Sequence, residues 1–113
     1  MIDQEKMQAI LDNFQTILAT ADPTATKFFS DNPGNFTVWT PIKFVAALSD
    51  DEGEDAYWDI QVERNTKIDP DPVVTAIYNA LLTARIQFEY EIDVERHENE
   101  SSYVRHLFSC KAR

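Results

Sequence analysis

Residues 86–95 alternate without a break between apolar and acidic or amide side chains. Successive side chains of a strand point to opposite sides, so this pattern predicts a strand with one buried face and one face in water. The predicted buried positions are Ile86, Phe88, Tyr90, Ile92 and Val94. The opposite face carries an acidic row, defined here as Glu89, Glu91, Asp93 and Glu95. This row has two interpretations: a surface or lumen kept negative for function, or a solvated edge kept soluble and free of stray pairing.

Apolar residues at three- and four-residue spacing predict two amphipathic helices. The first covers about residues 4–21, with Asp3 as its N-cap and Ile2 packing on Met7. The second begins at Pro72 after Asp71 and ends near residue 85. Its expected apolar stripe is Val74, Ile77, Tyr78, Leu81 and Leu82.

The dipeptide Asp22-Pro23 repeats the signature of a helix start. It predicts a short extra helix over residues 23–29, which would bring Phe28 and Phe29 onto the core.

A turn cluster at residues 30–35 precedes a segment rich in β-branched and aromatic residues. Because Pro41 lacks a backbone N–H, we expect two strand pieces, 36–40 and 42–48, the first of them at an edge or bulged. The buried face of the second piece would hold Ile42, Phe44, Ala46 and Leu48. After an acidic turn at 50–55, the alternation Ala56, Trp58, Ile60 and Val62 predicts the return strand of a hairpin.

Residues 103–111 are expected to return antiparallel to the strand 86–95. One register sets Glu95 opposite Arg105 and Glu89 opposite Lys111, so that opposite charges meet. That register places His106, Phe108 and Cys110 on the apolar face.

The predicted fold class is α+β: a four- to five-stranded antiparallel sheet of two hairpins packed against two amphipathic helices. The element order is helix, short helix, two strands, helix, two strands. A chain of 113 residues fits one domain, so residues 1–113 are expected to fold as a single unit.

Twenty acidic against ten basic side chains give a net charge of −10. Specific nucleic-acid binding through a basic face is therefore not expected, although nucleic-acid mimicry remains open. The chain has one cysteine and neither a secretion signal nor a membrane span, which favours a reducing, cytosolic history.

Few residues could carry chemistry. His106 and Cys110 share a face of the last strand, and the alternative to a metal or thiol site is a half-buried histidine and a small core thiol. The acidic turn lacks the ligand order of a calcium loop. Asp59, beside Trp58, is the one carboxylate that burial could activate, and an exposed strand position is the alternative. We therefore expect no catalytic, metal-binding or cofactor-binding residue and no cofactor, and we expect that the protein is not an enzyme.

Interaction candidates remain. Strand alternation puts Trp39 and Tyr57 opposite the predicted buried faces, where they indicate a partner interface or a second core layer under a helix. The acidic candidates are the acidic row and the turn residues Asp50, Asp51, Glu52, Glu54 and Asp55.

The layout of the chain, with the strand Tyr57-Trp58-Asp59-Ile60-Gln61-Val62 followed by a helix from Val73 to Leu82, resembles the tail terminator (tail-completion, head-tail joining) proteins of long-tailed bacteriophages. The resemblance implies a virion protein, assembled in the host cytoplasm as a hexameric ring. Such a ring caps the tail tube, stops its growth and contacts the head connector. A ring through which DNA slides would also account for the acidic row, because phosphates do not bind to a negative wall. The chain is short for that family, so the turn at 50–55 would have to serve as a ring contact or lumen arm.

A second hypothesis is a cytoplasmic acidic inhibitor, immunity protein or secretion chaperone that covers a basic partner surface. A third is an enzyme that uses clustered carboxylates and a divalent ion.

Overall fold

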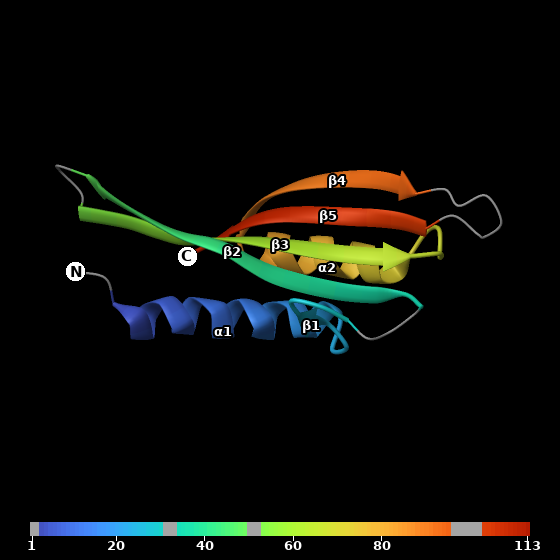
Figure 1. Cartoon of the computed structure of the whole chain (residues 1–113), viewed down its shortest axis with the longest axis horizontal. Coiled ribbons are helices and arrows are strands. Elements are labelled where there is room, and N and C mark those ends of the chain that lie inside the picture. The colour runs from blue at the N-terminus through green and yellow to red at the C-terminus, as the bar shows by residue number, and fades with distance from the viewer. Residues whose placement is uncertain (1–2, 31–33, 50–52, 96–102) are drawn as a thin grey trace.

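The computed structural model describes residues 3–30, 34–49, 53–95 and 103–113 (Figure 1). Two helices and five strands follow one another along the chain. They are α1 (Gln4–Ala21), β1 (Thr26–Lys27), β2 (Phe36–Ser49), β3 (Gly53–Thr66), α2 (Pro72–Thr83), β4 (Gln87–Glu95) and β5 (Tyr103–Ala112).

The strands form one sheet in the order β1-β2-β3-β5-β4. Both helices pack on the same side of it, because Phe14 of α1 contacts Trp39 and Tyr78 of α2 contacts Phe88, and these strand residues share one face through the ladder. We call this side the inner face and the opposite side the open face. The α+β prediction is confirmed, with one difference: β1 pairs parallel to β2, so the sheet is mixed.

Helix α1 has the predicted bounds. The carboxylate of Asp3 accepts hydrogen bonds from the backbone N–H groups of Glu5 and Lys6 at 3.0 and 3.1 Å. The helix stops at Asp22, whose extended backbone is what a following proline requires. Ile2, the proposed staple residue, lies outside the described residues. Four side chains bury one stripe of the helix: Ile10, Leu11, Phe14 and Leu18.

The predicted helix at 23–29 is wrong. Asp22 instead accepts hydrogen bonds from the backbone N–H and hydroxyl of Thr24, and the chain then enters strand β1. So short a helix has few backbone hydrogen bonds of its own, whereas pairing with β2 supplies them. Phe28 and Phe29 consequently lie on the surface and do not reach the core.

Strand β2 is continuous, and Pro41 marks a bulge where the register with β3 shifts between Pro41 and Lys43. Because the bulge adds one residue, it changes which positions face inward. Trp39 faces inward before it and Phe44 after it, opposite Val62 and Trp58. Ile42, expected in the core, is 56% exposed.

The β4–β5 hairpin forms with its register two residues from the prediction. Asp93 lies opposite Arg105, and Gln87 lies opposite Lys111. An even shift keeps every side chain on its face, so the predicted inner face is correct. Cover by α2 is incomplete, however: Ile92 is 58% and Val94 51% exposed, contrary to the prediction that both are buried.

Helix α2 begins as predicted, with Asp71 as N-cap and Pro72 in the first turn, but it ends at Thr83. Ile77 and Leu81 are buried as expected, whereas Tyr78 and Leu82 are exposed. The hydrophobic core between the helices and the sheet consists of Ile10, Leu11, Phe14, Leu18, Trp39, Ile60, Val62, Ile77, Leu81, Phe108, Cys110 and Ala112.

Candidate functional site

The open face of the sheet has no covering layer among the described elements. Its centre is a groove of about 500 Å³. One row of paired residues crosses this groove from β2 to β4: Lys43, Asp59, Lys111 and Gln87. The ammonium group of Lys43 lies 3.7 Å from the carboxylate of Asp59. Asp59, the carboxylate singled out from the sequence, is thus half-buried and paired with a lysine.

The acidic row lies on the open face at the sheet edge, with Glu89, Glu91 and Asp93 exposed. Arg105 of β5 donates to Asp93 at 2.7 Å and lies 3.8 Å from Glu63 of β3. Opposite charges do meet across the hairpin, but Asp93, not Glu95, faces Arg105. In the described part of the chain, Glu89 and Glu91 have no ion-pair partner, so these two charges are available for contacts. The side chain of Glu95 lies outside the described residues.

The two aromatic candidates differ. Trp39 is 1% exposed and packs on Phe14 with ring centroids 5.7 Å apart. It is therefore buried under α1, but on the inner face and not on the opposite face where the alternation placed it. The bulge at Ile42 explains the error, since it reverses the alternation that linked Trp39 to the rest of β2. Tyr57 is half-buried on the open face. The ammonium nitrogen of Lys111 lies 5.2 Å from the centre of its ring, and the guanidinium carbon of Arg113 lies 5.1 Å from it.

The acidic turn is described only in part. Asp50, Asp51 and Glu52 lie outside the described residues, as does the side chain of Glu54. Asp55 is exposed and pairs with Arg113 at 3.2 Å.

Strands β2 and β3 extend past the rest of the sheet. Strand β5 ends at Ala112 opposite Trp58, whereas β2 and β3 continue to pair from Val45–Tyr57 out to Ser49–Gly53. We call this two-stranded extension, residues 45–49 and 53–57, the arm. Figure 1 shows it projecting beyond the start of α1. Trp58, at its base, donates from Nε1 to the carbonyl of Met7 at 3.0 Å, which anchors the arm on α1.

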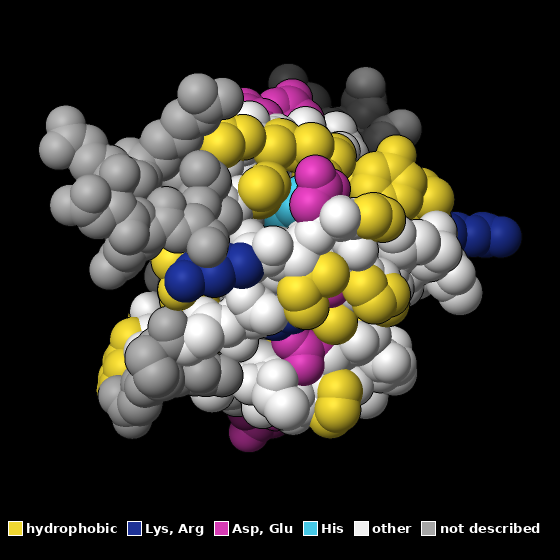
Figure 2. All heavy atoms as spheres, turned by 90° about the vertical axis from the view of Figure 1, so that its right-hand side faces the viewer, with side chains coloured by type: hydrophobic (Ala, Val, Ile, Leu, Met, Phe, Trp, Pro, Cys, Tyr) yellow, Lys and Arg dark blue, Asp and Glu magenta, His cyan; other side chains and the backbone are white. Residues whose placement is uncertain are grey.

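Besides the outer side of β1 and residues 53–57 of β3, which lie beyond the end of β5, two long strand edges are unpaired in the part that the structure describes. One is β4 along its whole length. The other is β2 from Thr40 outward, because β1 pairs only with Val38 and Trp39. The end of the molecule where β4 finishes faces the viewer in Figure 2, which shows several groups of hydrophobic side chains on this surface. Three exposed apolar residues near the β4 edge are Tyr78, Ile92 and Val94.

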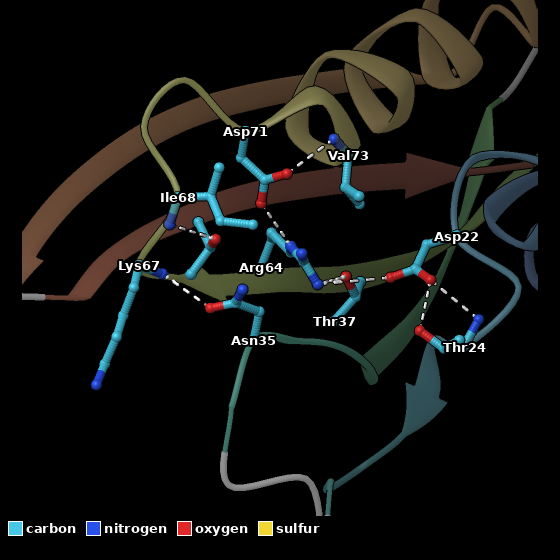
Figure 3. Close-up of polar contacts among 10 residues, drawn as sticks. Asp22, Thr24, Asn35, Thr37, Arg64, Lys67, Ile68, Asp71 and Val73 are labelled. Atoms are coloured by element: carbon cyan, nitrogen blue, oxygen red, sulfur yellow. Dashed lines mark hydrogen bonds and ion pairs between the residues drawn. The ribbon is translucent and has the colours of Figure 1, made fainter.

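A buried polar cluster that the sequence did not predict joins both helices to the sheet (Figure 3). Arg64 of β3 donates from Nε to Asp71 at 2.9 Å, and its Nη1 lies 3.8 Å from Asp22 and 3.5 Å from the hydroxyl of Thr37. Burial alone would raise the pKa of both carboxyl groups. Hydrogen bonds and the charge of Arg64 outweigh burial, so both pKa values lie below 3.8. The available signal was an aspartate before proline at each helix boundary, but nothing in the sequence pairs these with Arg64.

His106 and Cys110 share the inner face, as predicted. Burial lowers the pKa of His106, whose Nδ1 shares a hydrogen bond with the hydroxyl of Tyr90. Burial raises the pKa of the Cys110 thiol to about 12, so this thiol is protonated at neutral pH. Within the described ranges no three His, Cys, Asp or Glu side chains are grouped so that they could hold a metal ion. Neither described helix is long and apolar enough to span a membrane.

Comparison with protein-family models and with curated proteins finds no match. Among solved structures, the chain is similar to one from the virion of a native gene transfer agent particle. The alignment has 16% identity and a TM-score of 0.42, and covers 84% of this chain and 83% of that one.

Proposed function

We propose that this protein is a non-enzymatic structural subunit of a virion or phage-like particle. Its specific role would be that of a tail terminator: a ring subunit that caps the tail tube and contacts the connector. One observation carries the proposal, namely that the sheet, as far as the structure describes the chain, has unpaired edges on both sides, one of which continues into a projecting arm. The proposal rests on that geometry together with the layout resemblance, and the distant gene transfer agent chain adds no weight to it.

Two different edges on one subunit are what a ring needs. An interface between unlike surfaces repeats from copy to copy and closes when the rotation between neighbours divides a full turn. Unpaired edges otherwise invite uncontrolled association, and proteins usually shorten, cover or charge them. Here the acidic row charges one side of the β4 edge, while Ile92 and Val94 leave the other side apolar. Such an edge disfavours random pairing yet retains a surface for one matching partner.

The charge of the open face suits the same role. Glu89 and Glu91 are exposed and unpaired in the described chain, and the protein as a whole carries −10. If the open face lines a ring, DNA passing through it meets a wall that repels phosphates.

The same two carboxylates also favour the second candidate, an acidic protein that covers a basic partner. That candidate predicts a monomer or dimer whose binding to the partner weakens steeply with salt.

Light scattering on the purified full-length chain, over a range of protein and salt concentrations, tests the proposal. The expected result is one closed oligomer with a fixed number of subunits, seen as rings by negative-stain electron microscopy. A chain that stays monomeric or dimeric at every concentration would contradict the ring role and favour the second candidate.

A further inference from the structure

We infer that neighbouring copies join by strand addition, with the β4 edge of one copy pairing antiparallel with the arm side of β2, from Thr40 outward, in the next. The inference rests on the proposed function, because it specifies the interface of the ring. The occupant of each free edge is thus a second copy of this chain.

The directions of the strands favour this pairing. Each of the pairs β2–β3, β3–β5 and β5–β4 is antiparallel, so β4 runs opposite to β2 within one sheet. A neighbour placed in the same orientation therefore presents its β4 antiparallel to β2, with its helices on the same side. The joined sheet keeps one inner face and one open face across the interface.

The position of β1 decides which part of β2 is available. Through the row Gln87–Lys111–Asp59–Lys43, the first residue of β4 lies level with Lys43. A neighbour without any shift along the strands would therefore set β4 against the part of β2 that β1 already pairs. The neighbour must shift toward the arm, and a closed sheet of tilted strands requires a stagger between neighbours.

Side chains on the two edges match after such a shift. On the inner face, the exposed Ile92 and Val94 of β4 come beside Phe44 and Ala46 of β2. On the open face, the acidic row comes beside Val45 and Lys43, whose side chain is 65% exposed. Apolar side chains thus meet apolar ones, and carboxylates meet a lysine.

The arm itself needs such a partner. Beyond Val45 and Tyr57 no described helix or third strand covers it, and a two-stranded hairpin is marginally stable in water. A β4 strand from the next copy would make the arm three-stranded.

A symmetric β4–β4 dimer is the main competing arrangement. It would also be antiparallel, but it would bring two acidic rows side by side, where like charges repel. The same edges joined in the β4–β2 arrangement avoid that repulsion.

Cysteine cross-linking between differently labelled copies distinguishes the two arrangements. One protein carries Val45→Cys, and the other carries Glu89→Cys, Glu91→Cys or Asp93→Cys. Three positions on the open face of β4 are tested because the residue that lies opposite Val45 depends on how far the neighbour shifts along the strands. The native Cys110 is retained, since its thiol is buried and protonated; unsubstituted protein measures its background. The expected result is that one mixture gives several-fold more covalent dimer than either of its members alone.

A matched pair of variants tests the edge without cross-linking. Ile92→Lys and Leu82→Lys introduce the same charge at apolar residues with similar exposure, 58% and 55%, but only Ile92 lies on the β4 edge. Ile92→Lys should abolish the oligomer in light scattering, whereas Leu82→Lys should retain it. Circular dichroism and thermal unfolding serve as the control that both variants are folded. Equal loss of the oligomer in both variants would place the contact elsewhere and overturn the inference.

The remaining outcomes separate this inference from the proposed function. Self-cross-linking by a β4 variant alone, exceeding every mixture, overturns it in favour of the β4–β4 dimer. An intact ring with no cross-link of either kind overturns this interface and leaves the ring role standing. A monomer at all concentrations overturns both.

Discussion

Arg64 and Asp71 form an ion pair inside the molecule, with Nε of the guanidinium 2.9 Å from Oδ2 of the carboxylate and both side chains buried. The second oxygen of Asp71 accepts a hydrogen bond from the backbone N–H of Val73 at 2.9 Å, so the same carboxylate caps α2. Arg64 also faces Asp22 at the end of α1. One buried guanidinium therefore links the end of the first helix to the start of the second.

Removing the charge of Asp71 should leave Arg64 with a buried, poorly compensated charge. Asp71→Asn keeps an oxygen that can cap α2, and we expect it to lower the free energy of unfolding by about 3 kcal/mol or more. The matched control is Asp3→Ala, which removes the exposed cap of α1 and should cost about 1 kcal/mol. Urea unfolding measures both values. Equal losses in the two variants would show that the ion pair adds nothing beyond capping.

Acid should weaken the fold through the same cluster. The pKa values of Asp22 and Asp71 are lower in the folded chain than their ordinary value of 3.8, so folding favours the charged forms. Their contribution is complete above pH 3.8 and is lost as the pH falls below it toward the folded pKa values. Urea midpoints measured at descending pH should drop in this window, and the drop should be smaller in Asp71→Asn. A parallel decline in both proteins would assign acid sensitivity to other groups.

Trp39 and Tyr57 should respond very differently to truncation, although the sequence placed them in one class. Trp39→Ala leaves a cavity beside Phe14 and should cost about 3–5 kcal/mol of folding stability. Tyr57→Ala, at a half-exposed site, should cost less and leave the fold intact. Thermal and urea unfolding provide the comparison. A greater loss for Tyr57→Ala would contradict the burial of Trp39.

Charge reversal in the acidic row should separate folding from assembly. Glu89→Lys with Glu91→Lys leaves the Asp93–Arg105 pair intact and changes two exposed side chains, so stability should shift by no more than about 0.5 kcal/mol. The oligomer should nevertheless weaken, because the acidic row that lies beside Lys43 and Val45 of the next copy would then carry two positive charges in place of two negative ones. Adding Lys43→Glu should restore part of the oligomer in light scattering. Failure of that rescue, with the fold intact, would argue against contact between these two edges.

The elements themselves were largely predictable, because local physical chemistry sets them. The bounds of α1 follow from Asp3 and from the backbone restriction before Pro23, and α2 begins where Asp71 and Pro72 predict. The alternation over residues 86–95 assigned the two faces of β4 correctly, even though the register with β5 was two residues off. Because successive strand residues alternate between the two faces, a register shift of two residues leaves each side chain on the same face.

Pairing and cover between distant segments could not be derived in that way. An irregularity at Pro41 was expected, but its effect on which side chains face inward, including Trp39, depends on how β2 pairs with β3. Strand β1 likewise depends on its pairing with β2. The meeting of Arg64 with Asp22 and Asp71 depends on the packing of both helices on one face. The length of α2 and its path across the sheet leave Ile92 and Val94 in water. Local spacing thus determined the two long helices and the four long strands, and composition determined the sign of the net charge. The three-dimensional packing decided which edges and side chains remain free for a partner, because exposure depends on neighbours that are far apart in sequence.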